Sequence, residues 1–358
     1  MNGAREIRVL LVEDSRSQRE TLAWVIGTSR RLKLVGEAEN GARAVEMTAS
    51  LSPDIILMDC HMPVMDGIAA TREIMARHPT PIIMTSATSD TGDIHPGLEA
   101  LRLGALAIVP KPLDPTAASF DRTAAELCLT LEMLADVKVR RAPPIVPEPP
   151  ALAPAREAPM PGRPRKDIRI IAIGASTGGP PVVMQILRLC AADLVVPVIV
   201  AQHMCAGFIS GFASWLDRGA GVPVEVARDG DTALPGRVYV APEGGHLAID
   251  STGRFRVEDG APENGFRPSI SHLFRSVADS YGPHALGVLL TGMGQDGADG
   301  LLSIVHRGGT SVVQDRESSV VFGMPNAAIQ RGAAQRILPP KGIARFIVGQ
   351  MATRGLHT

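Results

Sequence analysis

One stretch near the middle of the chain restricts the fold more than any other. The run Ile170–Ile173 is apolar and mostly β-branched, and the glycine-rich segment Gly174–Gly179 and then Pro180-Pro181 follow it directly. Apolar residues at helical spacing come next. This order predicts a buried strand, a tight turn and a helix, with the hydroxyl of Ser176 at the turn.

The turn at Ser176 supports more than one interpretation. Residues 174–178 fit G-x-S-x-G, the turn that exposes a serine nucleophile above the end of a sheet. The flanking glycines allow close approach of a substrate, and the next helix offers free N–H groups to an oxyanion. A glycine-rich turn after a strand also suits a phosphate-binding loop, and it can be purely structural. This segment alone leaves the three alternatives open.

Length and composition exclude several classes of protein. The 358 residues suggest two domains, and 36 basic against 37 acidic residues give no general attraction to nucleic acid or anionic membrane. Aromatic residues make up only 3%, which argues against a base-stacking surface. Without a long apolar run or a signal-peptide pattern, we expect no membrane insertion and a cytoplasmic protein. The four cysteines form no C-x-x-C pair, so we expect reduced thiols.

The first part of the chain, residues 1–134, alternates short apolar runs with helical patterns. Strands that alternate with helices predict a parallel, doubly wound α/β sheet, in which ligands bind beyond the carboxyl ends of the strands. The five apolar runs are Arg8–Val12, Leu34–Glu37, Ile55–Met58, Ile82–Met84 and Ala107–Val109.

Polar residues follow four of these five runs. Glu13 and Asp14 come after the first, Asp59 after the third, Ser86 after the fourth and Lys111 after the fifth. Three converging carboxylates repel one another unless a hard cation neutralises them, and Mg²⁺ suits such ligands. Asp59 would then be a nucleophile that forms an acyl phosphate, with Lys111 and Ser86 contacting the phosphoryl group. A solvated face of scattered acids is the alternative.

A family resemblance joins these residues. The segment Met58–Gly67, MDCHMPVMDG, resembles the D-x-x-M-P-x-M-D-G signature of response-regulator receiver domains. The resemblance implies a flavodoxin-like fold, phosphorylation of Asp59 by a histidine kinase, and Mg²⁺ held by Glu13, Asp14 and Asp59. Ile108 departs from the family, which often has an aromatic residue there, so a rotating aromatic ring cannot report phosphorylation.

A proline-rich segment divides the chain. Leu127–Val137 has the pattern of an amphipathic helix, but nine of the 22 residues in Pro143–Pro164 are proline. That density predicts an extended, partly stiff spacer, a plain tether rather than a docking segment. We therefore expect a first domain at 1–134, a linker at 135–166 and a second domain at 167–350, free to change their relative placement.

Two further strand ends in the second domain carry polar residues. The run Pro197–Ala201 ends just before His203, and Leu286–Leu290 leads into a glycine-rich loop that holds Asp296. With Ser176, this gives a nucleophile, a base and an orienting carboxylate on one rim of a sheet. Taken singly, a strand-end histidine is more often a satisfied polar residue, and a loop aspartate is usually part of a turn.

Other chemistries fit the sequence less well. A short-chain dehydrogenase needs Tyr-x-x-x-Lys, but Tyr239 and Tyr281 are followed at the fourth position by Glu243 and Ala285. No G-x-x-x-x-G-K-[ST] phosphate loop is present. Cys205 lies two residues after His203, which leaves a cysteine–histidine nucleophile as a minor alternative.

Four separated motifs of the second domain resemble the catalytic domain of chemotaxis protein-glutamate methylesterases. The resemblance implies a Rossmann-like esterase domain that hydrolyses glutamate γ-methyl esters on methyl-accepting chemoreceptors and deamidates some receptor glutamines. Phosphorylation of the receiver would shift it away from the rim that carries the triad. A signalling adaptor that binds receptors without turnover is the rival. The motifs are Gly174–Gly179, Gln202–Met204, Leu290–Ala298 and Gln314–Pro325.

The same resemblance assigns roles to residues. Ser176 is the nucleophile, His203 the general base and Asp296 the residue that orients it, and the esterase site needs no cofactor. The backbone N–H groups near Thr177 and Met293 are candidates for the oxyanion hole. Cys205-Ala206 and His272 depart from the family pattern, which leaves the identity of the receptor open. His246 matches a family motif, and we expect it to be structural or groove-lining.

Overall fold

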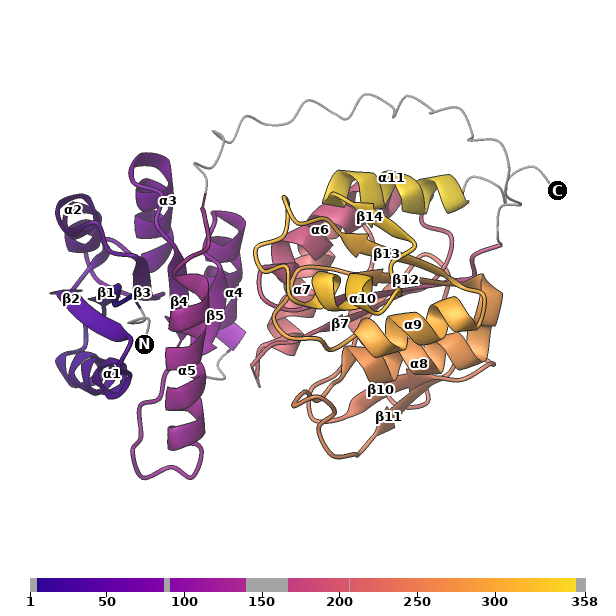
Figure 1. Cartoon of the computed structure of the whole chain (residues 1–358), viewed down its shortest axis with the longest axis horizontal. Coiled ribbons are helices and arrows are strands. Elements are labelled where there is room, and N and C mark those ends of the chain that lie inside the picture. The colour runs from indigo at the N-terminus through magenta and orange to yellow at the C-terminus, as the bar shows by residue number, and fades with distance from the viewer. Residues whose placement is uncertain (1–4, 87–90, 140–166, 206, 352–358) are drawn as a thin grey trace.

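The chain forms two parallel sheets, each covered by helices (Figure 1). The structure, a computed structural model, describes residues 5–86, 91–139, 167–205 and 207–351. The predicted spacer Pro143–Pro164 and the predicted departure at Ala206 lie outside these ranges. Within them, no helix has the length and apolarity needed to cross a lipid bilayer.

The first sheet has five parallel strands in the order β2-β1-β3-β4-β5. This is the flavodoxin-like order. After β2 is added on one side of β1, the later strands are added on the other side, so the strand order reverses between β1 and β3. Pro110 ends the edge strand β5, where its missing N–H costs no ladder hydrogen bond. The strands are β1 Ile7–Val12, β2 Leu32–Ala38, β3 Ile55–Asp59, β4 Ile82–Ser86 and β5 Ala107–Pro110.

Both faces of this sheet are buried, which explains why its strands are continuous apolar runs. Alternate residues of β1 and β3 enter different cores: Leu11 and Leu57 lie in one apolar cluster, Leu10 and Ile56 in the other. The helices are α1 Arg16–Thr28, α2 Gly41–Leu51, α3 Gly67–Arg77, α4 Thr91–Arg102 and α5 Phe120–Leu134.

The second sheet has seven parallel strands in the order β14-β13-β12-β6-β7-β9-β8. β6 lies at its centre between β7 and β12, and the strands that follow it fill first one side and then the other. The carboxyl ends of these three neighbours therefore form the crevice where ligands bind in such sheets. The strands are β6 Ile170–Ala175, β7 Val198–Gln202, β8 Val224–Val226, β9 Val238–Val240, β12 Ala285–Leu289, β13 Thr310–Gln314 and β14 Arg336–Leu338.

A small antiparallel hairpin, β10 with β11, precedes helix α8 in the second domain. It packs against α8, and Figure 1 shows the two elements together at one end of the domain. The hairpin strands are β10 His246–Ile249 and β11 Phe255–Glu258. The helices are α6 Gly179–Cys190, α7 Ile209–Ala220, α8 Ile270–Tyr281, α9 Ala298–His306, α10 Met324–Gln330 and α11 Pro340–Met351.

The two domains are packed together through the α4 side of the first domain (Figure 1). Helix α4 contacts α6 and α7, and one apolar cluster continues across the boundary. That cluster contains Leu98 and Leu101 of α4 as well as Phe208 and Phe212 from the start of α7. The first domain thus lies against α6 and α7 of the second domain.

The fold confirms the two predicted doubly wound sheets and locates each predicted strand within one or two residues. One helix differs in extent: the pattern indicated that Leu127–Val137 is helical, whereas α5 runs from Phe120 to Leu134 and ends before Val137. Its first turns are largely exposed, so they lack the apolar period from which the sequence predicted the helix.

Candidate functional site

Ser176 stands at the carboxyl end of the central strand β6, in the turn before α6. Its backbone N–H donates to the carbonyl of Thr291 at 3.0 Å, and its carbonyl accepts from Gly179 N–H at 2.8 Å. Gly178 has φ +74°, and a Cβ at this position would lie 2.5 Å from Val320. The turn that holds Ser176 therefore requires the glycine.

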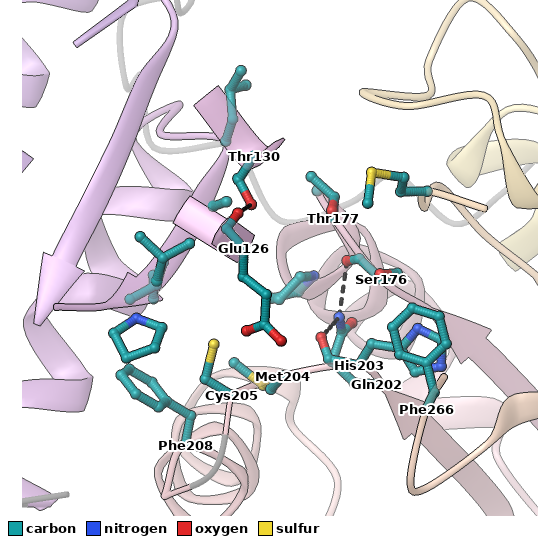
Figure 2. Close-up of a pocket in the computed structure, with 18 of the residues that line it drawn as sticks. Glu126, Thr130, Ser176, Thr177, Gln202, His203, Met204, Cys205, Phe208 and Phe266 are labelled. Atoms are coloured by element: carbon teal, nitrogen blue, oxygen red, sulfur yellow. Dashed lines mark hydrogen bonds between the residues drawn. The ribbon is translucent and has the colours of Figure 1, made fainter. Parts of the chain in front are cut away.

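Gln202 ties the Ser176 turn to the neighbouring strand end. Its Nε2 donates to the carbonyl oxygens of Ser176 at 2.8 Å and of His203 at 3.0 Å (Figure 2). The Gln202 side chain is buried at the end of β7, one residue before His203. This single amide fixes the spacing between the serine turn and the histidine.

His203 and Asp296 form a direct pair. The Nε2 atom of His203 lies 2.9 Å from Oδ2 of Asp296, and the Asp296 side chain is fully buried. The ring of Phe266 stacks on the His203 ring with centroids 3.7 Å apart and an interplanar angle of 5°. The bond and the stack together hold the imidazole in one orientation.

The start of helix α8 surrounds the Asp296 carboxylate with donors. Oδ2 accepts from Ile270 N–H at 2.7 Å, and Oδ1 accepts from Ser269 Oγ at 3.0 Å and Ser271 N–H at 3.1 Å. Burial acts to raise the pKa of Asp296, but the hydrogen bonds and charge of His203 and the α8 donors outweigh burial and lower it. Asp296 is therefore an ionised carboxylate at a helix N-terminus, where the helix dipole stabilises it.

The remaining histidine nitrogen is the one that can act as a base. Since Nε2 donates to Asp296, Nδ1 carries the free lone pair, and among the described residues it has no hydrogen-bond partner. His203 and Ser176 line one pocket of about 350 Å³. No Ser176–His203 hydrogen bond forms within the described part of the chain; such bonds often tighten only when substrate binds.

Thr177 and Met293 line the same pocket as Ser176. In the parts of the chain that the structure describes, neither backbone N–H donates a hydrogen bond, so both remain available to an oxygen in the pocket. Thr291 links the loop that carries Met293 to the turn that carries Thr177, because its Oγ1 donates to the Thr177 carbonyl at 3.0 Å. The two predicted oxyanion donors therefore border the same pocket as Ser176, Thr177 from the serine turn itself and Met293 from the loop after β12.

The first domain supplies one wall of this pocket. Its contributing residues include Pro110 at the end of β5 and Thr123, Glu126 and Thr130 of α5. Figure 2 shows Glu126 directing its carboxylate into the space beside Met204 and Cys205. In this arrangement the first domain borders the rim that carries Ser176 and His203.

A second polar cluster lies at the carboxyl ends of β1, β3 and β5. Oxygens of Glu13, Asp14 and Asp59 all lie within 4.8 Å of one another. Lys111 Nζ is 2.8 Å from a carboxylate oxygen of Glu13 and 2.8 Å from one of Asp59. The Oγ of Ser86 is buried and has no hydrogen-bond partner in the described residues.

The electrostatics of this cluster fit a divalent cation. Burial raises the pKa of Glu13 and of Asp59, and the Lys111 ammonium opposes this without cancelling it. Burial lowers the pKa of Lys111, but the charges of Asp59 and Glu13 outweigh it and raise the pKa. One lysine leaves this acidic cluster under-neutralised, and carboxylate oxygens are the ligands that Mg²⁺ prefers.

Every predicted site residue thus falls into one of these two clusters, and the sequence alone missed several of their neighbours. Ser269 carried a usable signal, because a serine before an apolar helical pattern is typical of an N-cap. Phe266 and Asn264 carried none, because their contacts join residues far apart in the sequence: Phe266 stacks on His203, and Asn264 Nδ2 donates to Asp296 Oδ1 at 3.4 Å. The Cys205 pKa is raised by burial to about 11, so its thiol is a poor nucleophile.

The fold and the two strand-end clusters define a receiver domain joined to an α/β domain of the esterase type. A family model described as CheB methylesterase matches residues 171–347, and one described as response regulator receiver domain matches residues 9–118. The chain belongs to the CheB methylesterase family, with a receiver domain ahead of the methylesterase domain.

Full-length relatives share both domains. Protein-glutamate methylesterase/protein-glutamine glutaminase 1 of Syntrophus aciditrophicus is 43% identical over 346 residues, 96% of this chain and 97% of the relative. Protein-glutamate methylesterase/protein-glutamine glutaminase 2 of Methanospirillum hungatei is 42% identical and covers 95% and 97%. The crystal structure of the Thermotoga maritima CheB methylesterase catalytic domain is 34% identical with a TM-score of 0.50, covering 51% of this chain and 98% of that one.

Proposed function

We propose that this protein is a phosphorylation-controlled serine esterase that hydrolyses glutamate γ-methyl esters on chemoreceptors and deamidates receptor glutamines. The observation that carries the proposal is the His203–Asp296 pair beside Ser176 at three adjacent strand ends. The relatives named above carry both activities in their names and match almost the whole chain. The substrate receptors and a chemotaxis histidine kinase would be its cytoplasmic partners.

The first half of the reaction forms an acyl-enzyme. Nδ1 of His203 takes the proton from Ser176 Oγ as that oxygen attacks the ester carbonyl carbon. The carbonyl oxygen becomes an oxyanion, which the N–H groups of Thr177 and Met293 stabilise. When the tetrahedral intermediate collapses, the bond to the methoxy oxygen breaks. His203 returns the proton to that oxygen, and methanol leaves.

The second half regenerates the enzyme. His203 takes a proton from water, and the hydroxyl oxygen attacks the acyl carbon. Collapse breaks the bond to Ser176 Oγ, which regains the proton from His203, and a glutamate side chain is released. A glutamine substrate follows the same path with ammonia as the leaving group. Asp296 remains ionised throughout and stabilises the imidazolium that forms twice in each turnover.

The receiver cluster would control access to this site. Asp59 would accept the phosphoryl group, Lys111 would pair with its charge, and the buried Ser86 hydroxyl would donate to one of its oxygens. Glu13, Asp14 and Asp59 would hold Mg²⁺, which when bound offsets the negative charge gathered at this site. Because the receiver borders the pocket, a shift of its packing after phosphorylation would open the rim.

Methanol release from a methylated chemoreceptor fragment tests both parts of the proposal. We expect release that depends on Ser176, so that Ser176→Ala lowers the rate by a factor on the order of 10⁴ to 10⁶. A small phosphodonor with Mg²⁺ should increase release by the wild type and leave Asp59→Asn unchanged. Equal stimulation of both proteins would refute control through Asp59, and release that survives Ser176→Ala would refute the serine mechanism.

A further inference from the structure

His246 begins strand β10, outside the pocket-lining residues, yet both of its ring nitrogens are used. Nδ1 accepts the backbone N–H of Ser269 at 3.2 Å, and Nε2 lies 3.0 Å from the carbonyl oxygen of Ala261. Because a backbone N–H can only donate and a carbonyl can only accept, the ring proton is on Nε2 and the imidazole is neutral. The residue is 4% exposed, so these two bonds fix its tautomer away from bulk water.

Ser269, whose N–H donates to His246, is the first of three consecutive residues that donate hydrogen bonds to Asp296. Ser269 is the N-cap of α8; its Oγ accepts from His272 N–H at 3.2 Å and donates to Asp296 Oδ1 at 3.0 Å. The next two backbone N–H groups, of Ile270 and Ser271, donate to the same carboxylate. A shift of the Ser269 backbone therefore moves three of the donors that place the partner of His203.

A second histidine supports the ring of His246 from outside. The His272 ring stacks on it with centroids 4.7 Å apart at 23°, and His272 Nε2 lies 3.1 Å from Glu258 Oε2. Glu258 is the residue opposite His246 in the β10–β11 hairpin. The hairpin thus contacts the start of α8 twice, through His246 to Ser269 and through Glu258 to His272.

We propose that His246 is a positioning residue of the esterase: through its Nδ1 bond to Ser269 it sets the place of the α8 N-terminus, and so the orientation of Asp296 and His203. It touches neither Ser176 nor the pocket. The inference rests on the function proposed above, because it concerns the same reaction. It adds a residue that the sequence patterns indicated only as structural or groove-lining.

Two variants that both replace the imidazole of His246 by a side-chain amide separate the roles of the two ring nitrogens. In His246→Asn the amide can stand at the position of Nδ1 and accept from Ser269, whereas in His246→Gln it can stand at the position of Nε2 and reach Ala261. His246→Phe keeps the stacking partner of His272 but has no nitrogen. His272→Phe serves as the control, since it keeps the ring stack and the backbone N–H that donates to Ser269 Oγ, and the imidazole nitrogens that it removes make no bond to Ser269 or Asp296.

We expect kcat for methanol release to fall in the Gln and Phe variants by roughly tenfold to 100-fold, the range for outer-shell partners that orient a histidine. KM should change little, and the Asn variant should recover most of the lost kcat. His272→Phe should stay close to wild type. Equal loss in the Asn and Gln variants, or wild-type kcat in all of them, would overturn the assignment.

A proton spectrum of the full-length protein gives a readout that does not depend on activity. The proton shared by His203 and Asp296 should give a downfield signal, identified by its loss in Asp296→Asn. We expect that signal to shift or broaden in His246→Gln and His246→Phe and to persist in His246→Asn, with thermal unfolding confirming that each variant is folded. An undisturbed signal in the Gln and Phe variants would refute the positioning role even if no receptor fragment proved to be a substrate.

Discussion

At the scale of single residues, Asp296 accepts hydrogen bonds both from His203 and from the start of α8, and one substitution tests what its charge does for the reaction. Asp296→Asn keeps the shape of the side chain but removes the charge that orients and stabilises the His203 imidazole. We expect kcat to fall by about 10⁴-fold with little change in KM, as when the orienting aspartate of a serine triad becomes asparagine. Steady-state methanol release measures this. A loss of only a few fold would mean that the carboxylate serves α8 rather than the reaction.

The lowered pKa of Asp296 also makes a stability prediction with a defined sign. A carboxyl whose pKa is lower in the folded than in the unfolded chain adds stability above its unfolded value of about 3.9. That stability is lost as the pH falls through the lower, folded pKa. The difference in urea midpoint between wild type and Asp296→Asn should therefore be larger at pH 7 than at pH 3. A constant difference at both pH values would contradict this.

At the scale of elements, the turn between β6 and α6 depends on one glycine. Gly178→Ala would hold a Cβ at φ +74° and push it to 2.5 Å from Val320, so strain and a clash act together. Positive φ alone costs an alanine roughly 1–2 kcal/mol. Gly332→Ala is the matched control, because its φ is +70° and no atom lies within 4 Å of the added Cβ.

Chemical unfolding and methanol release distinguish the two glycine variants. Gly332→Ala should lose stability from backbone strain alone and keep its activity. Gly178→Ala should lose more stability and also lose kcat, because the clash displaces the turn that carries Ser176. Equal destabilisation of the two variants with full activity in both would show that the Ser176 turn tolerates the shift.

The elements also show why some features were predictable and others were not. Strands buried on both faces, such as β6, are unbroken apolar runs bounded by polar residues, so the sequence located them and the residues at their ends. The hydrogen bonds from the start of α8 to Asp296 join residues 25 to 27 positions apart, and no local pattern encodes that contact. The start of α5 at Phe120 was not predicted because, after the buried Phe120, the residues up to Glu126 are exposed or partly exposed and show no apolar period.

At the scale of the whole molecule, the two domains meet at a pocket that neither forms alone. Residues of β5 and α5 line the same pocket as His203 and Met204, so the placement of the receiver determines how open the pocket is. Ile108 also lines the pocket, at the position where receiver domains often have an aromatic residue. Signalling from Asp59 would therefore act through the packing of the α4–β5–α5 side rather than through a rotating ring.

Glu126 offers the most direct test of that coupling. Its carboxylate enters the pocket from α5 beside Met204 and Cys205 (Figure 2), in the same pocket that Ser176 and His203 line. Glu126→Ala should open the rim and remove the negative charge, so basal methanol release should rise by about fivefold or more, as for a coupling of at least 1 kcal/mol. Release in the presence of phosphodonor should change little. Asp121→Ala, an exposed acid at the start of the same helix, is the control and should behave as wild type. If basal release is the same in both variants, the receiver does not restrict the site through α5, and control must pass through the α4 contacts with α6 and α7 instead.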